Sequence, residues 1–388
     1  MASGILSLLE VFVFNQRKTL SLLNIPALKC LIYHINYTHF ISMKTPLIIL
    51  LLFAAITVSA QEKHLKNIKQ LTFGGDNAEA YFSFDGKNLT FQCNNPAWGL
   101  KCDQIFELNI ARAAADSTYR PNQISTGMGR TTCSYFLPGN KQILYASTHL
   151  GGKDCPPNPE PRADHKYLWA IYPEFDIFVA DLKGNIVKQL TNTPGYDAEA
   201  TVSPDGKKIV FTSTRNGDLD LYTCDIDGKN VKQVTNQLGY DGGAFFSPDS
   251  KKLVFRASRP KTPEEIKEYK ELLAQNLVMP TNMEICICNV DGSDFRQVTH
   301  LGKANWAPFF TPDGKKIIFS SNHQSAKGYD FHLFLVNLDG TGLEQVTTES
   351  YFNAFPMFSP DGKKLVWSSN RNNHGTRDTN LFIADWVK

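Results

Sequence analysis

Short apolar runs separated by tight-turn signals recur along most of the chain. Residues 203–235 give the clearest copy. It opens on the turn Pro204-Asp205-Gly206, in which proline presets φ and glycine accepts a positive φ. An apolar, β-branched run follows at 209–212, and an alternating run follows at 219–225. An Asp-Gly turn then leads to a last short run at 231–234, so this copy predicts a small antiparallel sheet.

The unit recurs six times, at intervals of roughly 40 to 60 residues. Its turn appears as Phe84-Asp85-Gly86, Pro138-Gly139, Pro204-Asp205-Gly206, Pro248-Asp249-Ser250, Pro312-Asp313-Gly314 and Pro360-Asp361-Gly362. Its closing strand appears as Gln70-Leu71-Thr72, Gln123-Ile124-Ser125, Gln189-Leu190-Thr191, Gln233-Val234-Thr235, Gln297-Val298-Thr299 and Gln345-Val346-Thr347. Six turns in step with six closing strands, with about four short strands per unit, predict an all-β, six-bladed β-propeller.

The two ends of the repeat predict how the ring closes. Ile68 to Thr72 is typical of a closing strand but has no blade before it, whereas the last unit ends with Leu381 to Val387 and lacks one. We therefore expect the N-terminal strand to complete the last blade, which removes the unpaired edges of an open array. The expected blades are 76–126, 127–191, 192–235, 236–299, 300–347, and 348–388 together with 66–72.

Strands within a blade alternate in direction, so their connections alternate between two faces. One face receives the short Pro-Asp-Gly and Asp-Gly turns. The other receives the long insertions, at 94–101, 149–174, 259–283, 323–329 and 371–378. Binding residues lie preferentially on variable loops of a rigid scaffold, so we expect function on this loop-rich face. In the third insertion, the capping box Thr262-Pro263-Glu264-Glu265 and apolar residues at helical spacing predict a helix over 263–276.

The segment before residue 61 has the features of a secretory signal. Met43-Lys44 is a short positive start, 47–58 is apolar, and Val58-Ser59-Ala60 fits the small-x-small cleavage rule. We expect cleavage after Ala60 and a periplasmic or secreted protein of residues 61–388, with an uncleaved anchor as the alternative. Residues 1–42 precede a complete signal, which indicates a start codon assigned too early or a disordered extension. The apolar run is too short to predict a membrane span, and none is expected in the mature chain.

Seven cysteines follow residue 60, and export permits disulfides. Cys93 and Cys102 flank one predicted hairpin loop and are the first candidate pair, and Cys133 with Cys155 is the second. The odd number leaves at least one free thiol. Buried free thiols are expected at Cys224, Cys286 and Cys288.

One position of each innermost strand is polar throughout when the units are aligned on their turns. It is occupied by Asn77, Thr131, Asp197, Asp241, Asn305 and Asn353. Two residues further on lie Glu79, Cys133, Glu199, Gly243, Ala307 and Phe355. A period of two puts both sets on one side of their strands. If that side faces the central channel, the first set forms a polar ring near its mouth, either as a ligand site or as the lining of a water-filled channel.

Charged and aromatic residues are expected around the same mouth. Hairpin loops on that face begin with His149, Arg215, Arg259, His323 and Arg371, a potential cationic collar for carboxylates, and Arg130 is a further candidate there. The alternative is that Arg215 and Arg371 pair with the neighbouring Asp218 and Asp378 at turns. Trp98 and Trp169 fall in or beside insertions, as do Tyr172 and Trp306, and they suit either glycan and peptide contact or anchoring of the loops.

Other chemistries lack a sequence signal. The formal charge of +2 and the absence of a basic run argue against nucleic acid as a partner. The sequence contains no His-x-x-x-His or Cys-x-x-Cys spacing, no Gly-x-Ser-x-Gly or His-Glu-x-x-His motif and no glycine-rich phosphate loop. We therefore predict no metal, no cofactor and no catalytic residue.

The repeat resembles that of the TolB-type propellers. The resemblance lies in a closing Val-Thr, a loop and the run aromatic-Ser-Pro-Asp-(Gly/Ser)-Lys-Lys-Leu-Val, as at 234–259 and 346–371, and it covers about 72–388. It implies a six-bladed propeller, and TolB itself binds envelope partners. TolB also carries an α/β domain before its propeller, whereas about six residues precede the first propeller strand after the expected signal, so we expect a propeller without that domain. Related propellers occur beside peptidase domains and in a lyase family that acts on oligogalacturonate with histidines in the channel.

These observations predict an exported, monomeric binding module. It would hold an envelope or extracellular protein, a peptide or a glycan through the loop-rich face and channel mouth. The alternative is an enzyme that acts on carbohydrate as a lyase or hydrolase, with histidine and acid residues such as His149, His323 and Glu199 at the mouth. The two hypotheses are separated by whether two histidines and a carboxylate from different blades converge.

Overall fold

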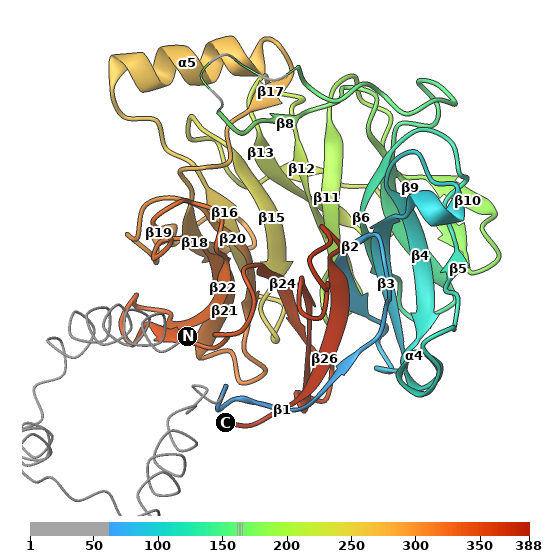
Figure 1. Ribbon diagram of the computed structural model, residues 1–388. Helices are drawn as coiled ribbons and strands as arrows, with labels where there is room; N and C mark the ends of the chain where they lie inside the picture. The colour runs from blue at the N-terminus through green and yellow to red at the C-terminus, as the bar shows by residue number, and fades with distance from the viewer. Residues whose placement is uncertain (1–61, 161, 163, 165) are drawn as a thin grey trace, which may run out of the picture. The chain divides into compact units, whose positions relative to one another are not determined.

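Six four-stranded antiparallel sheets make up the propeller in the computed structural model, which describes residues 62–160, 162, 164 and 166–388. The innermost strands contact one another in a closed ring, in the order β2, β6, β11, β15, β20, β24 and back to β2. Figure 1 shows the sheets standing side by side around a common axis. The expected signal peptide 43–60 and the segment 1–42 lie outside the described residues.

Each blade runs from its innermost to its outermost strand. Blade 1 holds β2 (Asp76–Phe82), β3 (Asn88–Asn94), β4 (Gln104–Asn109) and β5 (Asn122–Gln123). Blade 2 holds β6 (Thr131–Phe136), β7 (Gln142–Ser147), β9 (Asp176–Asp181) and β10 (Ile186–Gln189). Blade 3 holds β11 (Asp197–Val202), β12 (Lys208–Ser213), β13 (Asp220–Asp225) and β14 (Lys232–Gln233). Blade 4 holds β15 (Asp241–Phe246), β16 (Lys252–Ala257), β18 (Glu284–Asn289) and β19 (Arg296–Gln297). Blade 5 holds β20 (Asn305–Phe310), β21 (Lys316–Ser321), β22 (His332–Asn337) and β23 (Glu344–Gln345). Blade 6 holds β24 (Asn353–Phe358), β25 (Lys364–Ser369), β26 (Asn380–Trp386) and β1 (Leu65–Gln70). Blade 1 also carries the short helices η1 (Pro96–Trp98) and α4 (Ile110–Ala115).

The sixth blade confirms the predicted ring closure. Strand β1 pairs antiparallel with β26, at opposite ends of the described chain (Figure 1). The Thr72 hydroxyl then accepts a hydrogen bond from the Leu381 backbone N–H at 2.9 Å. The Thr235 hydroxyl accepts the same bond from Leu221 in blade 3, also at 2.9 Å. The N-terminal strand therefore makes the contacts that the repeat makes elsewhere within one blade.

The core lies between neighbouring blades. One aromatic side chain projects from the second strand of every blade, and each is fully buried. The set is Phe91, Tyr145, Phe211, Phe255, Phe319 and Trp367. Truncating a buried aromatic side chain to alanine typically costs about 3–5 kcal/mol, so these positions hold the blades together.

The Pro-Asp-Gly turns explain why one face of the propeller is short and regular. Ser203 Oγ donates to Asp205 Oδ1 at 2.6 Å, and the same carboxylate oxygen accepts from the Lys207 backbone N–H at 3.1 Å. The Ser or Thr to Asp bond recurs in four other blades, from Ser83, Ser247, Thr311 and Ser359. Each turn closes on itself, and the residue before its aspartate, which is Phe84 in blade 1 and a proline in the other four, lines an apolar cavity at this end of the propeller.

Every innermost strand carries a bulge at the same place. The pairing of β2 with β3 shifts register between Ala78 and Tyr81, and the other five innermost strands shift at the equivalent point. A residue with positive φ lies in each bulge: Glu79, Cys133, Glu199, Gly243, Ala307 and Phe355. A bulge of this kind re-aims the side chain that it carries.

Two insertions meet over one end of the channel. Strand β8 (Trp169–Ala170), from the blade 2 insertion, pairs with β17 (Leu277–Val278), from the blade 4 insertion. Helix α5 (Pro263–Leu273) precedes β17 and lies above the same end (Figure 1). The predicted capping box is present, because Thr262 and Glu265 bond each other's backbone, and the helix ends three residues before the predicted 276. We call the β8–β17 pair the roof.

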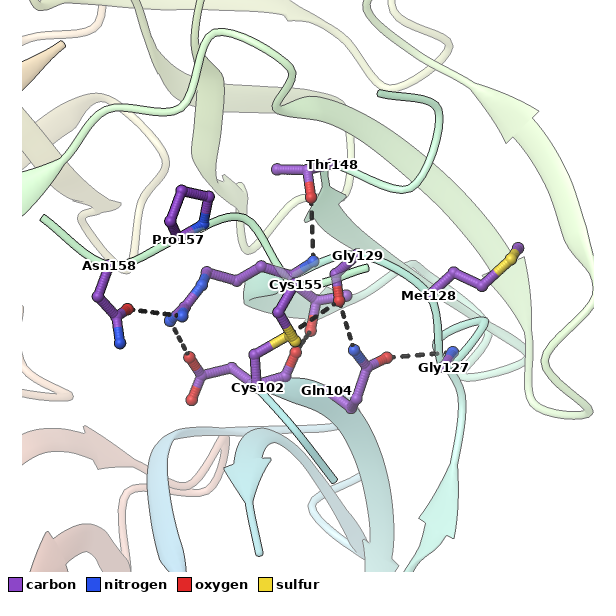
Figure 2. The surroundings of a disulfide bond; sticks show 12 residues. Cys102, Gln104, Gly127, Met128, Gly129, Thr148, Cys155, Pro157 and Asn158 are labelled. Carbon is purple, nitrogen blue, oxygen red and sulfur yellow. Dashed lines mark hydrogen bonds and ion pairs between the residues drawn. A yellow bond between two sulfur atoms is a disulfide. The ribbon is translucent and has the colours of Figure 1, made fainter. Parts of the chain in front are cut away.

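The disulfide differs from both predicted pairs, because it joins Cys102 to Cys155. Cys93, the expected partner of Cys102, lies opposite Gln104 in the β3–β4 pair, and its side chain is fully buried in the core. Cys133 occupies the bulge of β6 and faces the channel, away from Cys155. The blade 2 insertion folds back onto blade 1, which brings Cys155 to Cys102 (Figure 2). Cysteines 93, 133, 224, 286 and 288 are free and buried.

Candidate functional site

The first polar set fastens neighbouring blades together. Asn77 Nδ2 donates to the Thr379 carbonyl at 2.9 Å, and Asn305 Nδ2 donates to the Met283 carbonyl at 2.8 Å. Thr131 and Asn353 bond the preceding blade in the same way. The whole set is almost completely buried: Asn77, Thr131, Asp197, Asp241, Asn305 and Asn353. Of the six, Thr131 alone borders the channel-mouth cavity described below.

The expected cationic collar is folded onto its own blades. Arg215 pairs with Asp197 at 2.9 Å, and Arg259 pairs with Asp241 at 2.7 Å, where burial raises the pKa of Asp241 to about 7. Arg371 pairs with Glu62 at 2.5 Å. The arginine partners are therefore not the predicted Asp218 and Asp378. Each collar residue also packs on an aromatic ring of its blade; the five are His149, Arg215, Arg259, His323 and Arg371.

The bulge residues face the channel in place of the first set. Because the bulge interrupts the period of two, the two sets do not share one side of the strand. Glu79, Cys133, Glu199, Ala307 and Phe355 all line the space at the channel axis. Gly243 completes that ring of six.

Glu199 is held by a cluster that comes from two blades. Arg256 Nη2 donates both to Glu199 and to the Tyr240 hydroxyl, and that hydroxyl donates to Glu199 Oε1 at 2.6 Å. The other carboxylate oxygen accepts from the Gly243 backbone N–H and the Thr212 hydroxyl, each at 2.8 Å. Burial alone would raise the pKa of Glu199, but the Arg256 charge and these hydrogen bonds hold it below its ordinary value. Glu199 is therefore a fully bonded anion.

Two adjacent glycines make room for this cluster. An ideal Cβ on Gly243 would lie 1.9 Å from Arg256 Nη1, and one on Gly242 would lie 2.3 Å from Glu199 Oε2. Any other residue at either position would displace a buried charged group. The Gly-Gly pair in β15 is thus a requirement of the ion pair, and it occurs in no other innermost strand.

Glu79 lies in the equivalent bulge of blade 1 but has few partners. Its one hydrogen bond from an oxygen donor comes from the Tyr81 hydroxyl at 3.4 Å. Burial raises the pKa of Glu79 to about 7; a hydrogen bond with Cys133 opposes this shift, and the negative charge of Glu199 adds to it. No cation among the described residues forms an ion pair with it. Two glutamates at matching positions therefore have opposite environments.

A cavity of about 570 Å³ opens above these groups at the channel mouth. Arg130 and Asp103, which pair at 2.8 Å, contribute to one wall. Arg256 and the two glutamates lie at its deep end. The remaining lining is largely aromatic: Tyr167, Trp169, Tyr172, Phe175, Tyr196, Tyr240, Trp306, Phe352 and Phe355. Such a concave, aromatic lining with a few convergent polar groups is typical of a ligand site.

The roof covers part of this cavity. Trp169 of β8 packs against Trp306, with ring centroids 5.1 Å apart, and Arg256 lies over the Trp169 ring at 5.2 Å. The loop that carries the disulfide is fixed beside it, because Arg130 donates to Asn158 Oδ1 at 2.8 Å (Figure 2). The roof is therefore tied both to blade 1 and to the arginine at the deep end.

The cavity is closed toward the face that carries the short turns. Tyr81 and Phe245 come from opposite blades and lie in contact across the axis, with ring centroids 5.3 Å apart. Tyr135 and Phe309 extend this layer. A separate apolar cavity of about 340 Å³ lies below it and shares no lining residue with the upper one. A ligand of the upper cavity must therefore enter from the loop-rich face.

Of the residues predicted around the channel mouth, several line this cavity: Glu79, Arg130, Thr131, Trp169, Tyr172, Glu199 and Trp306. Trp98 lies elsewhere, beneath the Arg120 guanidinium on blade 1. Sequence reasoning missed Arg256, although a signal was present. The residues at its position in the other second strands are small or neutral: Gln92, Ala146, Thr212, Ser320 and Ser368. An arginine that breaks this pattern points to a special environment.

The described histidines do not converge. His149 packs on Phe178 in blade 2, and His323 packs on Phe334 in blade 5. Of the described residues that line the cavity, none is a histidine. Among the described residues, no group of three histidine, cysteine, aspartate or glutamate side chains is placed to hold a metal ion.

Comparisons with known proteins agree with this architecture. The family model for the TolB β-propeller domain matches residues 172–277. TolB from Acinetobacter baumannii is 18% identical with a TM-score of 0.53, over 78% of this chain and 64% of that one. A putative TolB from Agrobacterium tumefaciens is 19% identical with a TM-score of 0.52, over 83% of this chain and 97% of that one. An oligogalacturonate lyase in complex with manganese is 14% identical with a TM-score of 0.45, over 83% of this chain and 93% of that one. We infer nothing about this chain from so weak a similarity. No curated protein matches the sequence significantly.

The fold and the ring closure define a six-bladed β-propeller whose N-terminal strand completes the last blade. Within it, residues 172–277 match the TolB β-propeller domain family, and the two TolB structures share the propeller fold. The protein is a six-bladed β-propeller with a TolB-like segment. The part of the chain that the structure describes contains no helix long and apolar enough to cross a membrane.

Proposed function

We propose that this protein is an exported binding module that holds a peptide or glycan chain in the channel-mouth cavity. The observation that supports this most directly is the cavity itself, about 570 Å³ in volume and lined by aromatic rings. Ligand pockets combine apolar and aromatic walls with a few polar groups that orient the ligand, and this lining has both. Indole rings such as Trp169 provide flat surfaces for a sugar ring or an apolar side chain.

The surroundings of the mouth support contact with a larger partner. Three tyrosines on loops of this face are highly exposed: Tyr167 at 56%, Tyr329 at 76% and Tyr351 at 73%. Tyrosine is enriched in protein interfaces because it offers a large, rigid contact area with a polar end. A chain held in the cavity would pass over these residues as it leaves.

The disulfide supports the proposed location. Structural disulfides persist in oxidising compartments such as the periplasm or the extracellular space. The Cys102–Cys155 bond therefore fits export through the expected signal peptide. The carbohydrate-enzyme alternative required two histidines beside a carboxylate, and the described histidines do not meet that condition, so we do not propose it.

The proposal can be tested with the mature protein on a glycan array and against a displayed peptide library. A ligand selected on the wild type should bind Trp169→Ala at least tenfold more weakly, because that indole lines the cavity. Trp98→Ala is the matched control, since Trp98 lies on blade 1 away from the cavity, and it should change affinity less than twofold. Equal binding by wild type and Trp169→Ala for every selected ligand would refute the proposed site.

A further inference from the structure

We infer that the group recognised at the deep end of the cavity is an ammonium cation that pairs with Glu79, as on a free peptide N-terminus. This inference rests on the proposed function, because it names the chemistry of the ligand for the same cavity. It follows from the charges that line the cavity and from the different hydrogen-bond partners of Glu79 and Glu199. The size and composition of the space beside Glu79 then restrict the ligand further.

Among the described residues, the cavity lining contains three carboxylates and two guanidinium groups. They are Glu79, Asp103, Glu199, Arg130 and Arg256. Arg130 pairs with Asp103 at 2.8 Å, and Arg256 pairs with Glu199. Both arginines therefore already have an acidic partner, and no other described residue of the lining supplies a cation for Glu79. A ligand with one positive charge would complete the pairing.

The contrast with Glu199 shows what Glu79 lacks. Glu199 accepts four hydrogen bonds on its two oxygens, including one from a buried arginine. Glu79 has the same bulged backbone and the same orientation toward the axis, yet a single long bond from Tyr81 is its oxygen-donor contact. A partly buried carboxylate with few hydrogen-bond donors is less favourable than one that is fully paired. The Glu79 carboxylate can therefore accept further hydrogen bonds from a ligand.

A narrow space lies next to Glu79, between Cys133, Glu199 and Arg256. Its free volume is about 30 Å³, against about 570 Å³ for the cavity above it, so a compact group such as an ammonium fits there better than a sugar ring. The aromatic walls above it favour cations further, because π faces attract a positive charge, most strongly where water is excluded.

The experiment uses pairs of probes that differ in charge. Isothermal titration calorimetry at pH 7.0 compares Phe-Ala-amide with N-acetyl-Phe-Ala-amide, and phenethylamine with 3-phenylpropanol. The first pair presents a peptide N-terminus, and the second presents a simple amine. We expect each amine to bind at least about 30-fold more tightly than its neutral analogue, the size typical of a desolvated charge pair. Preference for Phe-Ala-amide over phenethylamine would identify a peptide as the source of the ammonium.

Glu79→Gln should remove the preference for the amine while leaving the fold intact, since the variant keeps the shape of the side chain. Glu271→Gln is the control for overall charge, because Glu271 is an exposed residue of α5, and it should keep the preference. An amine preference that survives in Glu79→Gln, or no binding of either amine up to 10 mM, overturns the inference. In both of these cases a library ligand lost in Trp169→Ala would still support the proposed function, so the two failures can be distinguished.

Discussion

Gly243→Ala is the sharpest test of the site as the structure presents it. The φ of Gly243 is +59°, and a Cβ there would lie 1.9 Å from Arg256 Nη1. The equivalent bulge residue of blade 5, Ala307, has a φ of 47°, so this backbone conformation accepts alanine. The conflict created by the substitution is therefore with the arginine and not with the bulge.

The expected loss of stability has two parts. Alanine in the left-handed region costs about 1 kcal/mol relative to glycine. Moving Arg256 leaves Glu199 as a buried charge without its partner, which typically costs about 3–5 kcal/mol. We expect Gly243→Ala to lower the free energy of unfolding by about 4–6 kcal/mol. Gly217→Ala is the matched control, because Gly217 has a φ of +87° and no atom within 4 Å of an added Cβ; its expected loss is about 1 kcal/mol.

The assay is unfolding in guanidinium chloride, followed by tryptophan fluorescence and far-ultraviolet circular dichroism. The same pair of measurements is made in an Arg256→Ser background, where serine is the residue that blade 5 has at this position. Without the guanidinium, Gly243→Ala should cost only about 1 kcal/mol, which gives a coupling energy of about 3–5 kcal/mol in the double-mutant cycle. Equal losses for the two glycine variants, or an additive cycle, would refute the argument.

Three further results are expected. Peptide mapping without reduction should recover Cys102 linked to Cys155, and any other cysteine pair would contradict the structure. Removing this bond, which spans 53 residues, should lower the free energy of unfolding by about 4 kcal/mol. Leu71→Ala, at 2% exposure in the closing segment, should cost about 2–5 kcal/mol, whereas Ile68→Ala, at 37% exposure in β1, should cost less than about 1; similar losses would argue against ring closure by this strand. The pKa of Glu79 is raised from 4.5 to about 7, so the folded state holds its proton longer and the wild type loses stability as pH rises between those values. Glu79→Gln should lack this loss: in chemical unfolding it should match the wild type at pH 4 and exceed it by about 2–3 kcal/mol at pH 8, and the opposite ordering would contradict the raised pKa.

The propeller was predictable because its signals are local and repeated. A Pro-Asp-Gly turn closes through its own serine and aspartate, as at Ser203 and Asp205, and needs no distant contact. The Gln-x-Thr closing strand likewise carries its own hydrogen-bond acceptor, so Thr72 could be recognised in the sequence as the missing part of blade 6. Because these signals are local, they recur in each blade and can be recognised there separately.

The candidate site was predictable only in part, because counting residues along a strand does not reveal a bulge. A strict period of two places Asn77 and Glu79 on one side of β2, whereas the positive φ of Glu79 separates them. The first residue is then buried between blades and the second faces the channel. The prediction of the disulfide was wrong for a related reason. Cys155 lies in an insertion of 26 residues, and the folding of this insertion back onto blade 1 depends on tertiary packing and not on local spacing.

The features that define the site are the places where one blade departs from the other five. Arg256 replaces a small or neutral residue, and Gly242-Gly243 replaces residues with side chains. The roof comes from the two longest insertions, in blades 2 and 4. A residue that repeats in every blade serves the ring, because the ring imposes the same packing on every blade. A residue that departs from the repeat has no such role, so in this protein the exceptions to the repeat are the proper candidates for mutagenesis, beginning with Glu79 and Arg256.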